Sequence, residues 1–144
     1  MPYTKDQRLQ NLIKKVAEKG KAIKFCVLGA GHGGLAMAGH LAILGFRVNL
    51  YNRSEERLQG VKWHGGIQLG GEIRGFGTIE RATSNIVEAI EDADILMVVV
   101  PATAHQTIAE TCAPYLKEGQ IIILNPGRTC GTLEFRKVLV DKGA

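Results

Sequence analysis

Four glycines in a run of six residues are the first sign of chemistry in this sequence. The run reads Gly29-Ala30-Gly31-His32-Gly33-Gly34, a G-x-G-x-x-G pattern directly after an apolar segment. Gly29 permits a tight turn, Gly31 lets the backbone approach a pyrophosphate, and Gly34 lets a helix pack closely against a strand. A helix that starts here would direct its free N–H groups and the positive end of its dipole at the phosphates. The pattern predicts a dinucleotide-binding turn, and the alternative is a glycine-rich turn with only a structural role.

A second candidate contact lies about 20 residues further on, where sites selective for NAD usually carry an acidic residue for the ribose 2′-hydroxyl. This sequence reads Asn52-Arg53-Ser54 there. A carboxylate would repel a 2′-phosphate, whereas Asn52 and Ser54 can donate hydrogen bonds and Arg53 can pair with it. The turn predicts NADP as the cofactor, with NAD as the alternative. A purely structural interpretation makes it a surface turn in which Ser54 only caps the next helix.

Two further turns follow apolar runs, at Val100-Pro101 and at Asn125-Pro126-Gly127. In open α/β sheets the ligand lies beyond the carboxyl ends of the strands, so both turns are expected to touch ribose or nicotinamide. The complete set of predicted nucleotide contacts is Gly29, Ala30, Gly31, His32, Gly33, Gly34, Asn52, Arg53, Ser54, Val100, Pro101, Asn125 and Gly127. No catalytic residue and no metal ligand is assigned.

Histidine and cysteine add little to this set. His32 could approach the pyrophosphate or the nicotinamide, and His105 could act as a general acid, but we favour a helix-surface position for His105. Cys130, beside Arg128, is expected to be exposed, yet a nucleophile needs a paired base and none is evident. The three cysteines lack C-x-x-C spacing, which argues against both a disulfide framework and a zinc site.

The elements that must position these turns alternate between strands and helices. We expect four central strands, at 23–28, 47–51, 95–100 and 120–124, and helices at 33–44, 54–58, 84–91, 103–116 and 132–140, with Thr103 and Gln106 as a capping box. The glycine-rich stretch 65–78 predicts a twisted hairpin or a pair of short strands. Strands that are apolar throughout are typical of a sheet covered on both faces. The chain is therefore predicted to be an α/β protein with a Rossmann-type, doubly wound, mainly parallel sheet.

An amphipathic helix is expected ahead of the sheet, from Lys5 to Lys19, with Thr4 and Gln7 as its capping box and Gly20 as its stop. Its apolar stripe is Leu9, Leu12, Ile13, Val16 and Ala17. We expect this helix, residues 1–22, to pack across the Rossmann domain of residues 23–144. The alternative is a docking surface for a partner subunit, which includes a homodimer.

Length and charge limit the classes of function. A chain of 144 residues is typical of one domain, and the longest uncharged apolar run, 95–102, is too short to cross a bilayer. No signal peptide is visible, so we expect a cytoplasmic protein without a membrane partner. The net charge is +4, but seven basic and only two acidic residues occur up to Lys24. Because the basic balance belongs to one terminal segment, nucleic-acid binding is not expected.

Taken together, the sequence resembles the N-terminal cofactor domain of the NAD(P)-dependent opine dehydrogenases, the octopine and nopaline dehydrogenase family. The resemblance covers about residues 23–140 and rests on four blocks: GAGHGGLAMAGHLA, GIQLGGEIRGFGTIE, ADILMVVVPATAH and ILNPGRTCGTLEF. Their order and spacing are more specific than the glycine pattern. Glycerol-3-phosphate dehydrogenase and ketopantoate reductase are similar in organisation.

This resemblance implies hydride transfer from a nicotinamide in the reductive condensation of an amino acid with a 2-oxo acid. It also implies a second, mostly helical C-terminal domain that carries the catalytic histidine and aspartate. That domain is expected to be absent from this chain, so no catalytic residue carries over. The alternatives are that a separate chain supplies the domain or that it has been lost by truncation. Gly29, Gly31, Gly34, Pro101 and Asn125 carry over as cofactor contacts, whereas the turn at 52–54 departs from the acidic NAD pattern.

Two other classes of function stay open at this point. A stand-alone nucleotide-sensing Rossmann module could dimerise through the N-terminal helix and report the cofactor to a partner. A scaffold that binds no cofactor is the third class. The leading hypothesis is the dinucleotide-binding part of an oxidoreductase, because the hairpin and the proline turn match dehydrogenases.

Overall fold

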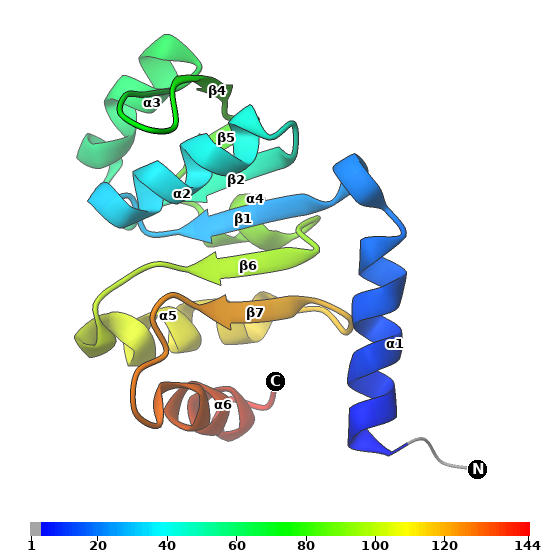
Figure 1. The fold of residues 1–144 in the computed structure, drawn as a ribbon. Coiled ribbons are helices and arrows are strands. Elements are labelled where there is room, and N and C mark those ends of the chain that lie inside the picture. The colour runs from blue at the N-terminus through cyan, green and yellow to red at the C-terminus, as the bar shows by residue number, and fades with distance from the viewer. Residues whose placement is uncertain (1–3) are drawn as a thin grey trace.

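The centre of the molecule is a five-stranded parallel sheet. The structure, a computed structural model, describes residues 4–144. The spatial order of the strands is β5 (Arg81–Thr83), β2 (Arg47–Tyr51), β1 (Lys24–Leu28), β6 (Ile95–Val98) and β7 (Ile121–Leu124). Helices lie on both faces (Figure 1). The predicted Rossmann-type, doubly wound α/β sheet is therefore confirmed.

The core has two layers, one on each face of the sheet. One face is covered by α2 (His32–Ile43), α3 (Gln59–His64) and the hairpin of β3 (Gly66–Leu69) and β4 (Gly75–Thr78), and the other by α4 (Ile86–Ile90), α5 (His105–Cys112) and α6 (Gly131–Asp141). Short 3-10 turns are η1 (Gly20–Ala22), η2 (Glu55–Leu58), η3 (Ala102–Ala104) and η4 (Ala113–Tyr115). Val27 and Leu28 of β1 point into opposite layers and are both fully buried, which explains why this strand is apolar without alternation.

The register of the strands brings the predicted turns to one edge. Leu28, the last residue of β1, lies opposite Tyr51 of β2 and Val98 of β6. The ladder continues one residue further, because the Gly29 N–H donates to the Tyr51 carbonyl at 2.8 Å and the Asn125 N–H donates to the Val98 carbonyl at 2.8 Å. The carboxyl ends of β1, β2, β6 and β7 therefore form one continuous edge.

The glycine-rich stretch forms the predicted hairpin, and its glycines are needed for backbone packing. A Cβ on Gly77 would lie 2.6 Å from the carbonyl oxygen of Gly39 in α2, and a Cβ on Gly66 would lie 2.2 Å from the Gly77 oxygen. Neither distance leaves room for a side chain. Gly77 therefore lets the hairpin pack against the backbone of α2, and Gly66 permits the close approach of β3 to β4.

Several predicted boundaries are wrong. The strand β5 was not predicted, because it has only three residues and two of them are polar. The helix expected at 103–116 is instead η3, α5 and η4; Thr103 caps nothing, and Pro114 cannot continue a helix because it lacks an N–H group. The helix α4 starts at Ile86, and Asn85 is its cap through a bond from the Val87 N–H at 3.0 Å.

The N-terminal helix α1 (Lys5–Ala17) forms with the predicted capping box of Thr4 and Gln7. It lies beside the amino ends of the strands and extends beyond them (Figure 1). Val16 is buried, but Leu9 and Ile13 stay 53% and 50% exposed. Leu12 and Val16 line one cavity together with residues 91–94 and 117–120, so the second half of α1 faces the domain while its first half is exposed. The expectation that the whole helix packs across the domain stays a prediction. No helix within residues 4–144 is long and apolar enough to cross a membrane.

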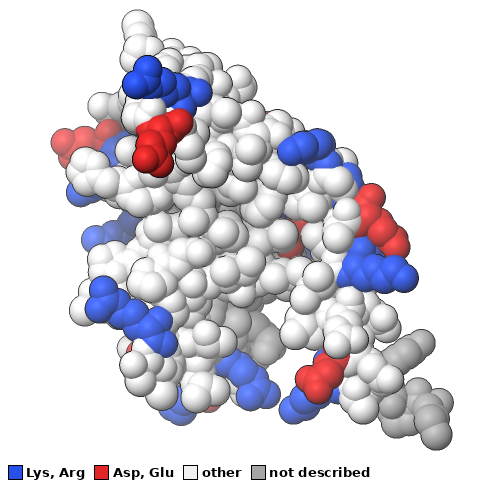
Figure 2. Space-filling model, viewed as in Figure 1, with Lys and Arg blue, Asp and Glu red and all other residues white. Residues whose placement is uncertain are grey.

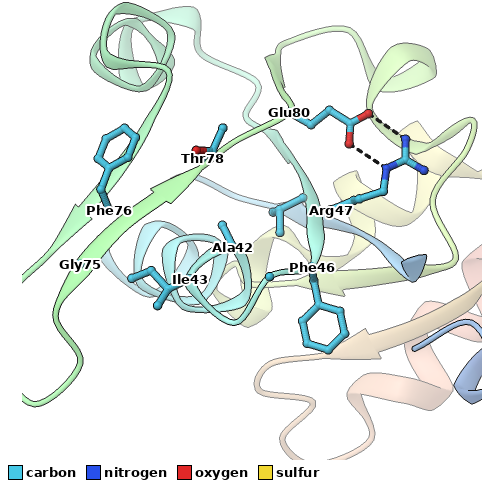
Figure 3. Close-up of a pocket in the computed structure, with 10 residues that line it drawn as sticks. Ala42, Ile43, Phe46, Arg47, Gly75, Phe76, Thr78 and Glu80 are labelled. Atoms are coloured by element: carbon cyan, nitrogen blue, oxygen red, sulfur yellow. Dashed lines mark hydrogen bonds and ion pairs between the residues drawn. The ribbon is translucent and has the colours of Figure 1, made fainter. Parts of the chain in front are cut away.

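A charge cluster closes the amino end of the sheet, opposite to the turns. The Lys24 ammonium is buried, and its Nζ lies 3.1 Å from Glu80 Oε1 and 2.7 Å from Asp92 Oδ2. Arg47 donates to both oxygens of Glu80, at 3.0 and 2.8 Å (Figure 3). A buried charge needs such partners because it has lost its water.

Charged side chains lie mostly along the margin of the face shown in Figure 2, around an uncharged centre.

This cluster predicts an acid-dependent stability. The bonds from Arg47, followed by those from Lys24, lower the pKa of Glu80 from 4.5 to about 2. Because the folded pKa is the lower one, ionised Glu80 stabilises the fold above pH 4.5, and this contribution is lost as the pH falls toward 2. Glu80→Gln should therefore lower the free energy of unfolding at pH 7 and reduce its dependence on pH between 4.5 and 3. Urea unfolding of wild type, Glu80→Gln and the exposed control Glu56→Gln measures this; an unchanged pH slope in Glu80→Gln would contradict it.

Candidate functional site

The turn between β1 and α2 is a close contact of two backbone segments. Gly29 has φ +117°, and a Cβ there would lie 2.4 Å from the Val99 carbonyl oxygen. A Cβ on Gly34, in the first turn of α2, would lie 1.8 Å from the Gly29 oxygen. Both positions therefore exclude any side chain. The helix begins directly against the end of the strand, as the glycine pattern predicts.

Gly31 differs from these two glycines because it borders open space. It is the N-cap of α2, makes no side-chain cap bond, and has no atom within 4 Å of the place a Cβ would take. The following residues His32 and Gly33 are exposed. The first N–H groups of a helix have no partner within the helix, so those of α2 are available to an anion that lies against Gly31. These residues fit a pyrophosphate group.

Asn52 ties the glycine turn to the turn after β2. Its Oδ1 accepts a hydrogen bond from the Ala30 N–H at 3.1 Å, and its Nδ2 donates to the Ser54 carbonyl at 3.0 Å. The sequence suggested that this amide donates to a phosphate, but here it holds the two turns together. Ser54 does not cap η2 with its side chain. Arg53 and Ser54 are exposed beside the site.

A cavity of about 280 Å³ opens between these turns and the start of α5. Its lining residues are Gly29, Tyr51, Asn52, Arg53, Val100, Thr103, Ala104, Thr107 and Ile108. Gly29, Asn52, Arg53 and Val100 were predicted as contacts. Thr103 and Thr107 were missed, although their spacing of four residues places them on one face of a helical segment. Mostly apolar walls with a few polar groups suit a planar base.

The remaining predicted contacts lie along the same edge, outside this cavity. Pro101 is exposed and precedes η3, and Asn125 follows β7 and donates from Nδ2 to the Ile123 carbonyl at 3.1 Å. Gly127 is half-buried in the next turn, after a cis peptide bond between Asn125 and Pro126. The edge therefore runs from the cavity across β6 to β7.

The electrostatics beside the cavity favour an anion. Arg53 is the one charged residue in its lining. Glu55, two residues further on, accepts bonds from Lys62 Nζ at 2.7 Å and Ser84 Oγ at 2.6 Å, and the bond from Lys62 lowers the pKa of this carboxyl. The nearby carboxylate is therefore paired with protein groups, and no acidic residue lines the cavity.

His105 is not where the sequence suggested. It is 1% exposed at the start of α5, so the helix-surface interpretation is wrong. The physical reason is that α6 packs against α5 and covers this side chain, with Gly131 next to the imidazole ring. Cys130 is exposed as expected. Within residues 4–144, no group of three or more His, Cys, Asp or Glu side chains could hold a metal ion.

A second cavity of about 490 Å³ lies at the opposite end of the sheet. It is lined by the end of α2, the start of β2 and the strand β4, and Arg47 and Glu80 at its rim bind each other (Figure 3). None of the predicted nucleotide contacts lines it. This cavity is larger than the one beside the glycine turn, but its two charged residues, Arg47 and Glu80, bind each other. It also lies away from the glycine turn.

The fold and the carboxyl edge together define a Rossmann-type domain that binds a nicotinamide dinucleotide. Comparison with known families identifies it further. Residues 24–137 match the family described as the NAD binding domain of 6-phosphogluconate dehydrogenase. The chain belongs to this family.

Two relatives agree with that assignment. The chain is 43% identical over 121 residues to an opine dehydrogenase of Arthrobacter sp. (strain 1C), which covers 83% of this chain and 34% of the relative. It is 36% identical over 104 residues to a glycerol-3-phosphate dehydrogenase [NAD(P)+] of Nitratidesulfovibrio vulgaris strain Hildenborough, covering 70% of this chain and 31% of the relative. The chain thus spans about a third of the length of these curated relatives.

Solved structures show the same similarity. Octopine dehydrogenase in complex with NADH and agmatine matches 85% of this chain and 33% of that one, with a TM-score of 0.75 and 25% identity. A ketopantoate reductase from Ralstonia solanacearum matches 72% of this chain and 31% of that one, with a TM-score of 0.60 and 25% identity. The resemblance seen in the sequence is therefore confirmed, and the chain is similar to the NAD-binding domain of opine dehydrogenase-like oxidoreductases.

Substitution by alanine should have opposite effects at Gly34 and at Gly31. Gly34→Ala should destabilise the domain by about 3 kcal/mol or more, because the added Cβ overlaps the Gly29 oxygen. Gly31→Ala should leave the melting temperature nearly unchanged but weaken nucleotide binding at least tenfold, because its Cβ occupies the space open to the ligand. Thermal unfolding and calorimetric titration with NADPH measure the two effects. Wild-type affinity in Gly31→Ala would show that the phosphates do not approach this residue.

Proposed function

We propose that this chain is the cofactor-binding part of an NAD(P)-dependent oxidoreductase of opine dehydrogenase type. The observation that carries the proposal is the uncapped start of α2 at Gly31, which opens beside the 280 Å³ cavity in a chain 43% identical to an opine dehydrogenase. The bound nicotinamide would supply the hydride for condensing an amino acid with a 2-oxo acid. The residues of this chain bind and orient the dinucleotide.

Each part of the carboxyl edge has a proposed role. The N–H groups of Gly31–Gly34, which include those of His32 and Gly33, bind the pyrophosphate, since a helix start favours negative charge. Gly29 and Ala30 form the floor of the turn. The cavity beside Val100 takes the adenosine. Pro101, Asn125 and Gly127 face the nicotinamide and its ribose, because they follow the next strands along the edge.

We also propose that the site prefers NADP to NAD. Arg53 and Ser54 are exposed at the end of β2, where they can bind a 2′-phosphate. Asn52 supports this turn through its bonds to Ala30 and Ser54. The carboxylate of Glu55 is held by Lys62 and Ser84, so it does not repel a phosphate at the turn. A charge-assisted bond of about 1.5 to 3 kcal/mol would favour NADP by roughly ten- to a hundredfold.

The cofactor preference can be tested with one pair of charge reversals. Arg53→Asp should weaken NADPH binding by roughly ten- to a hundredfold and NADH binding much less, because only NADPH carries the 2′-phosphate. Arg57→Asp makes the same charge change four residues away, outside the lining of the cavity, and should affect both cofactors little. Calorimetric titration of each variant with both cofactors measures this. Equal losses for NADPH and NADH in Arg53→Asp would refute the preference.

The catalytic groups are proposed to come from a second, mostly helical domain. The sheet of residues 23–144 is the cofactor domain, and α1 with the turn up to residue 22 is an extension of it.

The three cysteines of the described chain are unpaired, which supports a reducing compartment such as the cytoplasm. We also propose a homodimer, in which the exposed side chains of Leu9 and Ile13 on α1 would contact the second copy.

If the catalytic groups lie in a second domain, this chain should bind the cofactor without catalysing the reaction. The 144-residue chain should bind NADPH but should not oxidise it in the presence of pyruvate and amino acids, because no catalytic acid or base for the substrate is assigned to it. Absorbance at the nicotinamide band, followed in the same sample used for calorimetry, measures both properties. Enzyme-like oxidation by this chain would contradict the proposed need for a second domain.

A further inference from the structure

His105 is a buried polar side chain for which packing alone gives no reason. It is 1% exposed, and neither Nδ1 nor Nε2 has a hydrogen-bond partner among residues 4–144. A neutral imidazole has one N–H donor and one lone pair, and leaving both unmatched inside a protein costs free energy. An apolar ring of the same size would avoid that cost. A polar group kept in such a place is therefore a candidate for a functional role.

The imidazole ring of His105 lies close to the end of the turn that follows β7. A Cβ on Gly131 would lie 3.6 Å from His105 Nδ1 and 3.8 Å from Leu124 Cδ1. Leu124 is the last residue of β7, and Gly131 is the first residue of α6. The imidazole therefore lies beside Gly131, where the six-residue segment 125–130 ends and α6 begins.

That segment has a backbone that its own sequence does not stabilise. Arg128 and Cys130 have φ angles of 46° and 60°, in the left-handed region that residues with a side chain avoid. Such conformations persist only when surrounding groups hold them. The same segment carries Asn125 and Gly127, which we assign to the nicotinamide end of the dinucleotide.

The other face of the same helical turn belongs to the adenosine cavity. Ala104, Thr107 and Ile108 line that cavity, and they flank His105 in the sequence. The start of α5 therefore lines the cavity on one side and, through His105, faces Gly131 at the end of segment 125–130 on the other. The ring of His105 therefore lies between the part of the site assigned to the adenosine and the part assigned to the nicotinamide.

We propose that His105 is a positioning residue for the cofactor: its imidazole holds segment 125–130 so that Asn125 and Gly127 face the nucleotide. A ring nitrogen takes its hydrogen-bond partner from the backbone of this segment when the nucleotide is bound. This inference rests on the proposed function, because it assumes that the carboxyl edge binds a nicotinamide dinucleotide. It adds a residue that does not touch the ligand itself.

The test compares an apolar and a polar replacement. His105→Phe keeps an aromatic ring and removes both nitrogens, so its free energy of unfolding should equal or exceed that of the wild type, while its affinity for NADPH falls about tenfold, the value of one hydrogen bond. His105→Asn packs less well but keeps a polar group near the position of Nδ1, and should recover most of the affinity. Gln106→Ala, on the exposed side of α5, is the matched control and should bind as the wild type does.

The outcomes separate this inference from the proposed function. Wild-type affinity in a folded His105→Phe variant would show that His105 only fills the core. A wild-type chain that binds neither NADPH nor NADH would overturn the proposed function itself. If His105→Phe does not fold, the wild-type protein labelled with ¹⁵N at histidine still decides: the ring nitrogens of His105 should change their chemical shifts on saturation with NADPH, and unchanged shifts would overturn the inference.

Discussion

The contact between the Gly29 carbonyl and the backbone of Gly34 is the constraint on which the rest of the site depends. A Cβ at position 34 would lie 1.8 Å from the Gly29 oxygen, so α2 can start against the end of β1 only when this residue has no side chain. This close approach places the start of α2 at the carboxyl edge of the sheet. It also leaves Gly31 at the N-cap with open space in front of it. The proposed binding of an anion at this turn is therefore a consequence of how tightly the helix and the strand pack.

The two ends of the sheet have separate tasks. At the amino end, Lys24 and Arg47 both donate hydrogen bonds to Glu80 beside the start of β1 and β2, so these charges contribute to stability. At the carboxyl end, Arg53 keeps its charge exposed beside a cavity without acidic groups. This separation allows changes at the binding edge without loss of the network that holds the opposite edge together.

Local patterns were predicted from the sequence, and long-range effects were not. The unit around residues 29–34 was predictable because a glycine pattern, an apolar strand and a small-residue helix agree with one another there. The strand β5 was not, because Arg81–Thr83 is short and mostly polar and becomes a strand only by pairing with β2. His105 was misplaced since its burial depends on α6, which follows it by 26 residues. Asn52 lines the cavity at the carboxyl edge, but its bonds to the neighbouring turns depend on geometry that a sequence does not contain.

The central claim is that the dinucleotide lies along the carboxyl edge, with its pyrophosphate at the start of α2. Backbone amide NMR during a titration with NADPH tests it most directly. The account predicts that the largest shift changes occur at residues 30–34, with further changes around Arg53 and Thr103, while the cavity near Arg47 and Glu80 at the opposite end stays unchanged. Shift changes concentrated at that opposite cavity, with none at residues 30–34, would contradict the account.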